Sequence, residues 1–165
     1  MLDIFRLGCA VGVLSFVGAA GPVAAAGDHH TAQAGAIKVV HVWTRAVSDP
    51  KKPADVFLDI ENRGGEDRLI GVVSQDAETA AIVGLSTRGD TVVAQPLGSA
   101  GVPARGRLRL DPDGFAIRLE GLKRPLGIDQ EFDLVLKFER AGELRVKGEV
   151  MKPNARQHSH AGHSH

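Results

Sequence analysis

The chain has one cysteine among its 165 residues, and that residue, Cys9, lies in an apolar segment near the N-terminus. A protein without a cysteine pair has no disulfide to hold its fold, and a mature chain without cysteine has no thiolate ligand for copper or zinc. Methionine is nearly as scarce, with only Met1 and Met151. We therefore expect a fold stabilised by a hydrophobic core, and any metal binding to depend on histidine.

The chain also lacks an excess of charge of either sign. Lys plus Arg and Asp plus Glu number 20 each, and the two signs are interspersed along the sequence. Nucleic acids and anionic membranes select proteins with a basic surface patch. The composition therefore argues against both kinds of partner.

Signatures of catalysis and of nucleotide binding are missing as well. No glycine-rich loop follows a strand-like run and opens a helix, as a nucleotide site would require. Ser86, Thr87 and Asp90 are close in sequence, but a catalytic triad needs a histidine beside the serine, and the central part of the sequence has none. We expect neither an enzyme nor a small-molecule substrate.

The N-terminus has the pattern of an export signal. A short start ending at Arg6 precedes an apolar stretch, residues 7–17, and a run of alanines follows. This order predicts a signal peptide over residues 1–26 that is cleaved on export to the periplasm. The alternative is an uncleaved membrane anchor, since the uncharged span is about long enough to cross a bilayer, but its glycines disfavour a permanent helix. Lipidation of Cys9 is not expected, because Arg6 lies three residues before it.

Most of the remaining sequence alternates apolar and polar residues with the period of β-strands. The alternation is clearest in Val56–Ile60, Phe115–Leu119 and Phe132–Phe138. Turn-forming residues, such as Asp111-Pro112-Asp113-Gly114, separate the runs. About nine short strands at this spacing, with no convincing helical period, predict an all-β sandwich.

The strand pattern also sets the expected domain boundaries. Residues 27–36 are small and polar and predict a flexible leader. The sandwich is expected over residues 37–151, and residues 152–165 form a His-rich tail expected to be disordered without metal. Within the sandwich, residues 76–85 contain enough alanine to permit a helix, but their β-branched residues favour a strand.

Four stretches of the sequence match the pattern of a known family. They are Val42 to Ala46, Ile60 to Leu69 (Ile-Glu-Asn-Arg-Gly-Gly-Glu-Asp-Arg-Leu), Gly121 to Leu126 (Gly-Leu-Lys-Arg-Pro-Leu) and Phe138 to Gly142 (Phe-Glu-Arg-Ala-Gly). In this order they resemble the PCu(A)C-type periplasmic copper chaperones over residues 37–150. The resemblance implies a cupredoxin-like Greek-key β-sandwich, Cu(I) binding, and a role in supplying copper to cytochrome c oxidase.

The resemblance further implies where a copper site would lie: an early histidine, a later methionine, and a His-x-Met pair on the strand before Gly121. In this sequence the pair falls on Ala116 and Arg118, the early histidine near Val83 and the methionine near Val92. None of these residues can ligate copper. The Arg118 charge would also repel a cation, by about 4 kcal/mol at 4 Å and an effective dielectric of 20. We therefore expect the family's His/Met site to be lost.

Histidines gather instead at the C-terminus. Four of the seven occupy the last eight residues, as His158, His160, His163 and His165. Neutral imidazole is a borderline-soft ligand for copper, zinc and nickel, and four of them on one flexible peptide can wrap an ion. These four residues are the predicted metal ligands, with copper, as Cu(I) or Cu(II), the expected ion and zinc or nickel the alternatives. An expression tag or a solvating terminus is the other interpretation of this pattern.

The other candidate ligands have simpler explanations. His29 and His30 lie in the leader, and they would join the tail only if both termini emerge at the same end of the sandwich. His41 falls in a strand-like run and is expected to be a packed or surface residue. Met151 is expected to end the last strand rather than to bind metal.

Together these features predict a monomeric, periplasmic copper-binding protein of chaperone type. Its tail would capture copper and pass it by ligand exchange to an acceptor, such as a cytochrome c oxidase subunit or an assembly factor. The alternative is a degenerate family member that binds a respiratory-assembly partner without metal. Arg118 and Glu120 would then form part of the docking surface; their simpler interpretation is an ion pair or a solvated edge.

Overall fold

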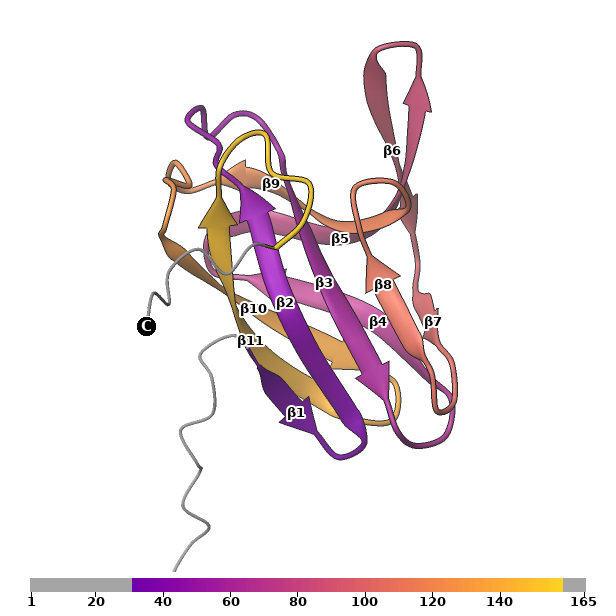
Figure 1. Cartoon of the computed structure of the whole chain (residues 1–165). Helices are drawn as coiled ribbons and strands as arrows, with labels where there is room; N and C mark the ends of the chain where they lie inside the picture. Colours follow the sequence, from indigo (N-terminus) through magenta and orange to yellow (C-terminus); the bar gives the residue numbers. More distant parts are fainter. Residues whose placement is uncertain (1–30, 159–165) are drawn as a thin grey trace, which may run out of the picture.

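The computed structural model describes residues 31–158 and has eleven strands in this range (Figure 1). The predicted signal peptide, His29, His30, His160, His163 and His165 lie outside the described residues. The strands are β1 (Ala32–Ala34), β2 (Ile37–Arg45), β3 (Ala54–Asn62), β4 (Asp67–Ser74), β5 (Ala77–Arg88), β6 (Thr91–Leu97), β7 (Ala100–Val102), β8 (Arg107–Leu110), β9 (Phe115–Leu122), β10 (Glu131–Phe138) and β11 (Gly142–Met151). The all-β prediction is confirmed, and of residues 76–85 all but Asp76 belong to β5 rather than to a helix.

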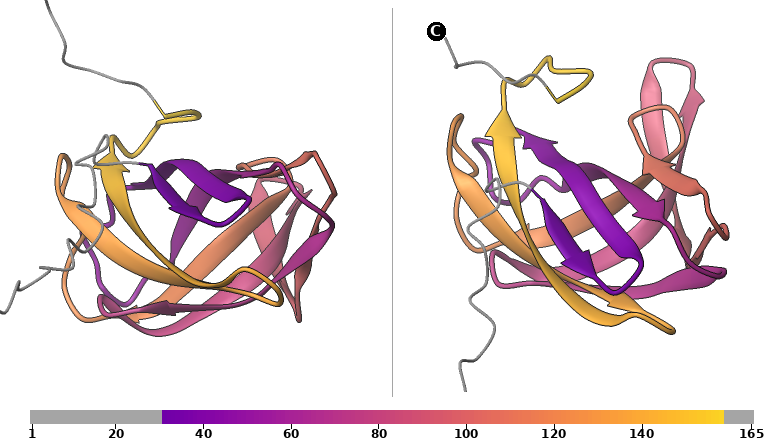
Figure 2. Two further views of the ribbon diagram at one scale, coloured as in Figure 1. Left: turned by 90° about the horizontal axis from the view of Figure 1, so that it is seen from below. Right: turned by 60° about the horizontal axis from the view of Figure 1, so that its bottom comes forward.

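One strongly curved sheet contains all of these strands. Its order is β6-β5-β9-β3-β2-β11-β10-β4-β7, while β1 pairs with β2 and β8 with β3. All pairs are antiparallel except β11 with β2. The sheet curls round so that strands far apart in this order face each other, and β4 packs on β5 (Figure 2). The result is the sandwich that the sequence predicts.

Alternation decides which face of each strand enters the core. In β10, Phe132, Leu134, Leu136 and Phe138 are buried, while the residues between them are partly exposed. Buried residues from most of the other strands join them in one main cluster between the layers of the sandwich. Burial of this apolar surface is the main stabilising term in a fold without disulfides.

Two of the stretches that carry the family resemblance meet at one end of the sheet, where they fix the turns. The buried Asn62 side chain donates to the carbonyl oxygens of Gly65 and Pro103 and accepts from the Gly64 amide. The carboxylate of Asp67 accepts from the backbone amides of Arg68, Arg140 and Ala141. These residues therefore hold turns in place.

Two segments outside the predicted sandwich are more ordered than expected. Within the leader, Ala32–Ala34 forms β1 and pairs with β2 through a turn in which Gly35 adopts a φ of 57°. After β11, residues 152–158 pack back against β2 instead of hanging free, and Arg45 Nε donates to the Ala155 carbonyl at 2.7 Å. Residues 31–158 include no helix with the length and apolar character needed to cross a bilayer.

Candidate functional site

The chain turns back over the sheet after β11 (Figure 1). This segment brings the first histidine of the tail, His158, beside His41 of β2. His158 is the one predicted metal ligand among the described residues, and its side chain is only 4% exposed. Its Nε2 lies 3.5 Å from Glu149 Oε2, at the end of β11. Its ring centroid lies 5.7 Å from that of His41 in β2, with the two rings tilted by 43°. The structure thus places a tail imidazole beside a strand imidazole.

His41 owes its position to a bulge in β2. Val40 pairs with Asp59 and Trp43 with Phe57, so β2 uses one more residue than β3 between the same two pairs. His41 lies at this extra step and has a φ of 55°, in the left-handed region that residues other than glycine seldom adopt. The sequence predicted a packed or surface histidine, and the half-exposed side chain agrees. The bulge and the neighbouring His158 were not predicted.

An acidic residue lies behind His41. Asp59 Oδ2 is 3.4 Å from His41 Nδ1, and Asp59 Oδ1 accepts a hydrogen bond from Arg109 Nε at 3.0 Å. Asp59 belongs to β3, directly beside β2, and its side chain is mostly buried. The carboxylate is therefore fixed by Arg109 and faces one ring nitrogen of His41. Asp59 carries no signal in the sequence, because it is one of many acidic residues at polar positions of strands.

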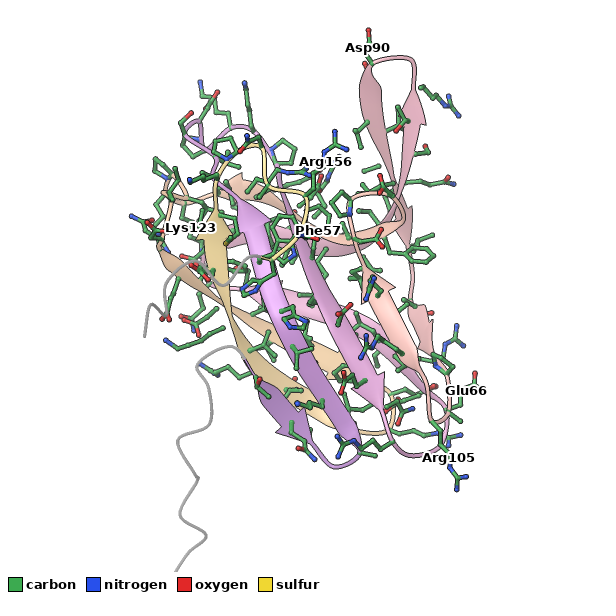
Figure 3. All side chains as sticks on the ribbon, viewed as in Figure 1. Phe57, Glu66, Asp90, Arg105, Lys123 and Arg156 are labelled. Atoms are coloured by element: carbon green, nitrogen blue, oxygen red, sulfur yellow. The ribbon has the colours of Figure 1, made fainter. Side chains whose placement is uncertain are left out.

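These residues line a surface pocket of about 320 Å³. Its walls come from β2, β3, the turn after β8 and the C-terminal segment, whose Arg156 is labelled in Figure 3. The charged and polar side chains around it are His41, Asp59, Arg109, Asp111, Asp113, Arg156, Gln157 and His158. Three carboxylates and two guanidinium groups leave one net negative charge when both imidazoles are neutral, which favours a cation.

Two of the positions that the resemblance assigns to copper ligands, Val83 and Ala116, lie beside this pocket and are apolar. Val83 of β5 and Ala116 of β9 are cross-strand partners, and both are buried. They pack in a second cluster with Trp43, Phe57 and Met151, in which the Trp43 and Phe57 rings lie 4.8 Å apart. Trp43 belongs to this cluster and also lines the pocket.

Val92, the position that the resemblance implies for the methionine, also lacks a donor, and it is exposed in β6. Met151 carries a thioether but lies outside the implied positions; it ends β11, as the sequence predicted, and is buried in the apolar cluster. Among residues 31–158 no group of three or more His, Cys, Asp or Glu side chains is arranged to hold a metal ion. A metal site built on the described residues therefore needs further donors.

Arg118 forms the ion pair that the sequence allowed. Its Nε and an Nη donate to the two carboxylate oxygens of Asp55 at 2.8 and 2.9 Å, and the two residues are opposite each other in β9 and β3. The hydrogen bonds to Asp55 raise the pKa of Arg118, and burial opposes this in part. Only 18% of the Arg118 side chain is exposed, so it offers little surface to a docking partner.

Comparisons with known proteins agree with the fold. The family model described as "Putative lipoprotein LpqE-like" matches residues 37–150. The "Putative lipoprotein Lxx21020" of Leifsonia xyli subsp. xyli is 31% identical over 108 residues, which cover 64% of this chain and 64% of that protein. The match thus spans just under two thirds of that relative's length.

Among solved structures, the apo PCuAC domain from PmoF1 is 27% identical, with a TM-score of 0.64, and the match covers 75% of this chain and all of that domain. The copper-bound PCuAC domain from PmoF2 is 25% identical, with a TM-score of 0.64, over 75% of this chain and 99% of that domain. Apo-DR1885 from Deinococcus radiodurans, at 24% identity and a TM-score of 0.56, shares the fold. The resemblance inferred from the four sequence stretches is confirmed: the chain belongs to the LpqE-like family, and its β-sandwich is a PCuAC-type domain.

Proposed function

We propose that this protein binds copper in the cell envelope through its tail histidines, His158, His160, His163 and His165, and passes the ion to an acceptor protein. The observation that carries the proposal is that His158, the first histidine of this run, is packed on the sheet of a PCuAC-type domain. The copper-bound PCuAC domain from PmoF2 and the Cu(I) form of DR1885 support copper as the cargo. The lipoprotein names of the relatives support an envelope location.

The role we propose is that of a carrier rather than an enzyme. A metal ion held by the imidazoles of one peptide exchanges its ligands more readily than an ion in a closed cage. Each imidazole can leave the ion separately while the others still hold it. An acceptor with a better ligand set, such as a subunit or assembly factor of cytochrome c oxidase, would take the ion stepwise. The apolar Val83–Ala116 region contributes no donor to this process.

A deletion that keeps the contact between Arg45 and Ala155 tests the proposal. Removal of residues 158–165 eliminates all four tail imidazoles but keeps Ala155, whose carbonyl accepts from Arg45. We expect residues 27–165 to bind at least one copper ion per chain at micromolar protein concentration, and the deletion to bind only trace amounts. Calorimetry and native mass spectrometry measure the copper bound by each of the two proteins.

A matched control keeps the length of the tail and changes its four histidines to glutamine. It should behave like the deletion, because glutamine lacks the imidazole donor. Titrations with Zn²⁺ and Ni²⁺ as competitors rank the affinities of the chain for copper, zinc and nickel. If the chain with the intact tail bound no more than trace copper, the proposed function would be wrong.

A further inference from the structure

His41 and His158 are placed as two ligands of one ion would be. Two imidazoles that bind the same metal through bonds of about 2.0–2.1 Å have ring centroids roughly 5 to 6.5 Å apart. The observed separation of 5.7 Å lies within this interval. The two residues come from β2 and from the segment after β11, so tertiary structure, not sequence proximity, brings them together.

Both rings also have a carboxylate next to one nitrogen. Asp59 Oδ2 is 3.4 Å from His41 Nδ1, and Glu149 Oε2 is 3.5 Å from His158 Nε2. Metal-binding histidines almost always give one ring N–H to a carboxylate, a carbonyl or water, which fixes the tautomer and directs the other nitrogen to the ion. The Asp59 contact favours the proton on His41 Nδ1, and the lone pair is then on Nε2.

The backbone at His41 is a third, independent observation. A left-handed conformation in a strand is unfavourable for a non-glycine residue, and such conformations cluster at functional sites. Here the bulge turns the imidazole of a central strand toward the pocket that His158 also lines. Without the bulge, the side chains of β2 would alternate strictly between the two faces of the sheet, and β2 would not have the extra residue opposite β3.

From these observations we propose that His41 and His158 form a two-imidazole anchor that holds a copper ion against the domain. The inference rests on the proposed function and adds a ligand from the folded sheet to it. The anchor itself consists of these two imidazoles, both of which are among the described residues. The loaded tail is then held at β2, beside Trp43, rather than moving independently of the domain.

The experiment uses the chain from residue 27 to residue 165 and the substitution His41→Asn. Asparagine tolerates the left-handed region, so the bulge is kept while the imidazole is removed. We expect the affinity for Cu²⁺ to fall by roughly tenfold or more, the scale on which even partners behind metal ligands act. The Cu²⁺ EPR spectrum should lose one nitrogen coupling.

Trp43 provides a second readout, because it is the only tryptophan and lines the same pocket. Cu²⁺ held by His41 should quench its fluorescence, and His41→Asn should weaken the quenching at equal occupancy. Arg156→Gln is the matched control: Arg156 also lines the pocket, but its guanidinium is no donor to copper. This control should bind Cu²⁺ at least as tightly as the unaltered chain.

A measurement on the unaltered chain makes the test independent of any folding defect. Substoichiometric Cu²⁺ should broaden the NMR amide signals of His41 and Val42 together with those of the tail. If only tail signals broadened, and His41→Asn bound Cu²⁺ with unchanged affinity and spectrum, the anchor would be refuted while the tail proposal stood. Absence of copper binding by the unaltered chain would instead remove the proposed function itself.

Discussion

The charge of Arg118 has a different consequence in the folded protein from the one that its position in the sequence suggested. As an isolated guanidinium it would repel a cation at the edge of β9. In the structure Asp55 compensates it through two hydrogen bonds, and most of both side chains is buried. Repulsion by Arg118 is therefore a weak reason to expect that the family's copper site is lost. The apolar side chains of Val83 and Ala116, which have no donor atoms, are the stronger reason for that expectation.

The Arg118–Asp55 pair leads to a prediction about stability. Asp55→Asn leaves a mostly buried guanidinium without its counter-charge, and we expect the free energy of unfolding to fall by about 1.5–3 kcal/mol. Urea denaturation measures this change. Glu120→Gln, at an exposed position two residues after Arg118 on the same strand, is the control and should change stability by less than about 0.5 kcal/mol. Equal stability of the two variants would show that the pair contributes nothing.

At the scale of elements, the stretches that carried the family resemblance act on turns and strand ends. Asp67 begins β4 and joins it to the β10–β11 hairpin through the amides of Arg140 and Ala141. Arg124, in the Gly-Leu-Lys-Arg-Pro-Leu stretch, donates to Asp76, Gln130 and the Glu131 carbonyl. Because these contacts set the path of the chain, they identify the fold from sequence and say nothing about metal ligands.

Asp67 makes stability dependent on pH. Burial raises its pKa, but the backbone hydrogen bonds from Arg140, Arg68 and Ala141 together outweigh burial and leave the pKa below the ordinary 3.8. The unfolded chain then takes up a proton more readily than the folded one, so this stabilisation is present above pH 3.8 and is lost as the pH falls through the lowered pKa.

We expect Asp67→Asn to lower the free energy of unfolding by about 1.5–3 kcal/mol at pH 7, and the difference from the unaltered chain to shrink below pH 4. Urea titrations at several pH values measure it. Glu66→Gln, at the neighbouring exposed position labelled in Figure 3, is the control and should show no such convergence. A difference independent of pH would mean that the Asp67 carboxylate does not act through its charge.

Gly148 gives a packing prediction for β11. A Cβ at this position would lie 2.8 Å from Val42 Cγ1 and would overlap the Phe132 ring. Gly148→Ala should therefore destabilise the fold by about 1–3 kcal/mol, through overpacking of the core. Thermal unfolding of Gly148→Ala and of Gly98→Ala compares this site with one where an added Cβ meets nothing within 4 Å. Similar melting temperatures would show that the core can adjust.

At the scale of the whole molecule, the alternation of apolar and polar residues was enough to predict the fold but not the site. Strands with one buried face, such as β10, show their alternation directly, and the sandwich follows from them. β1 and β7 have only three residues each, too few to show a period. The meeting of His41 and His158 depends on a bulge and on a chain reversal after β11, and both arise from packing between distant residues. No local pattern could have revealed them.

Residues 152–157, which reverse the direction of the chain after β11, have a role in stability that distinguishes them from the His-rich residues that begin at His158. Ala155 packs against the Trp43–Phe57 cluster, and the Arg45 guanidinium, which donates to the Ala155 carbonyl, lies 5.9 Å from the Trp43 ring centroid and 5.5 Å from that of Phe57. Residues 152–157 therefore cover an aromatic surface that would otherwise face water. Removal of residues 152–165 should lower the free energy of unfolding by about 1–3 kcal/mol and shift Trp43 emission to longer wavelength.

Removal of residues 158–165 alone keeps this cover, so Trp43 emission should stay close to that of the unaltered chain and the loss of stability should be smaller. Fluorescence spectra and urea denaturation of the two deletions, without metal, make the comparison. If both deletions gave the same emission and stability, residues 152–157 would add nothing to the domain. If the longer deletion alone changes both, the C-terminal segment has two parts: one covers the aromatic cluster, and the other begins at His158 and carries the imidazoles.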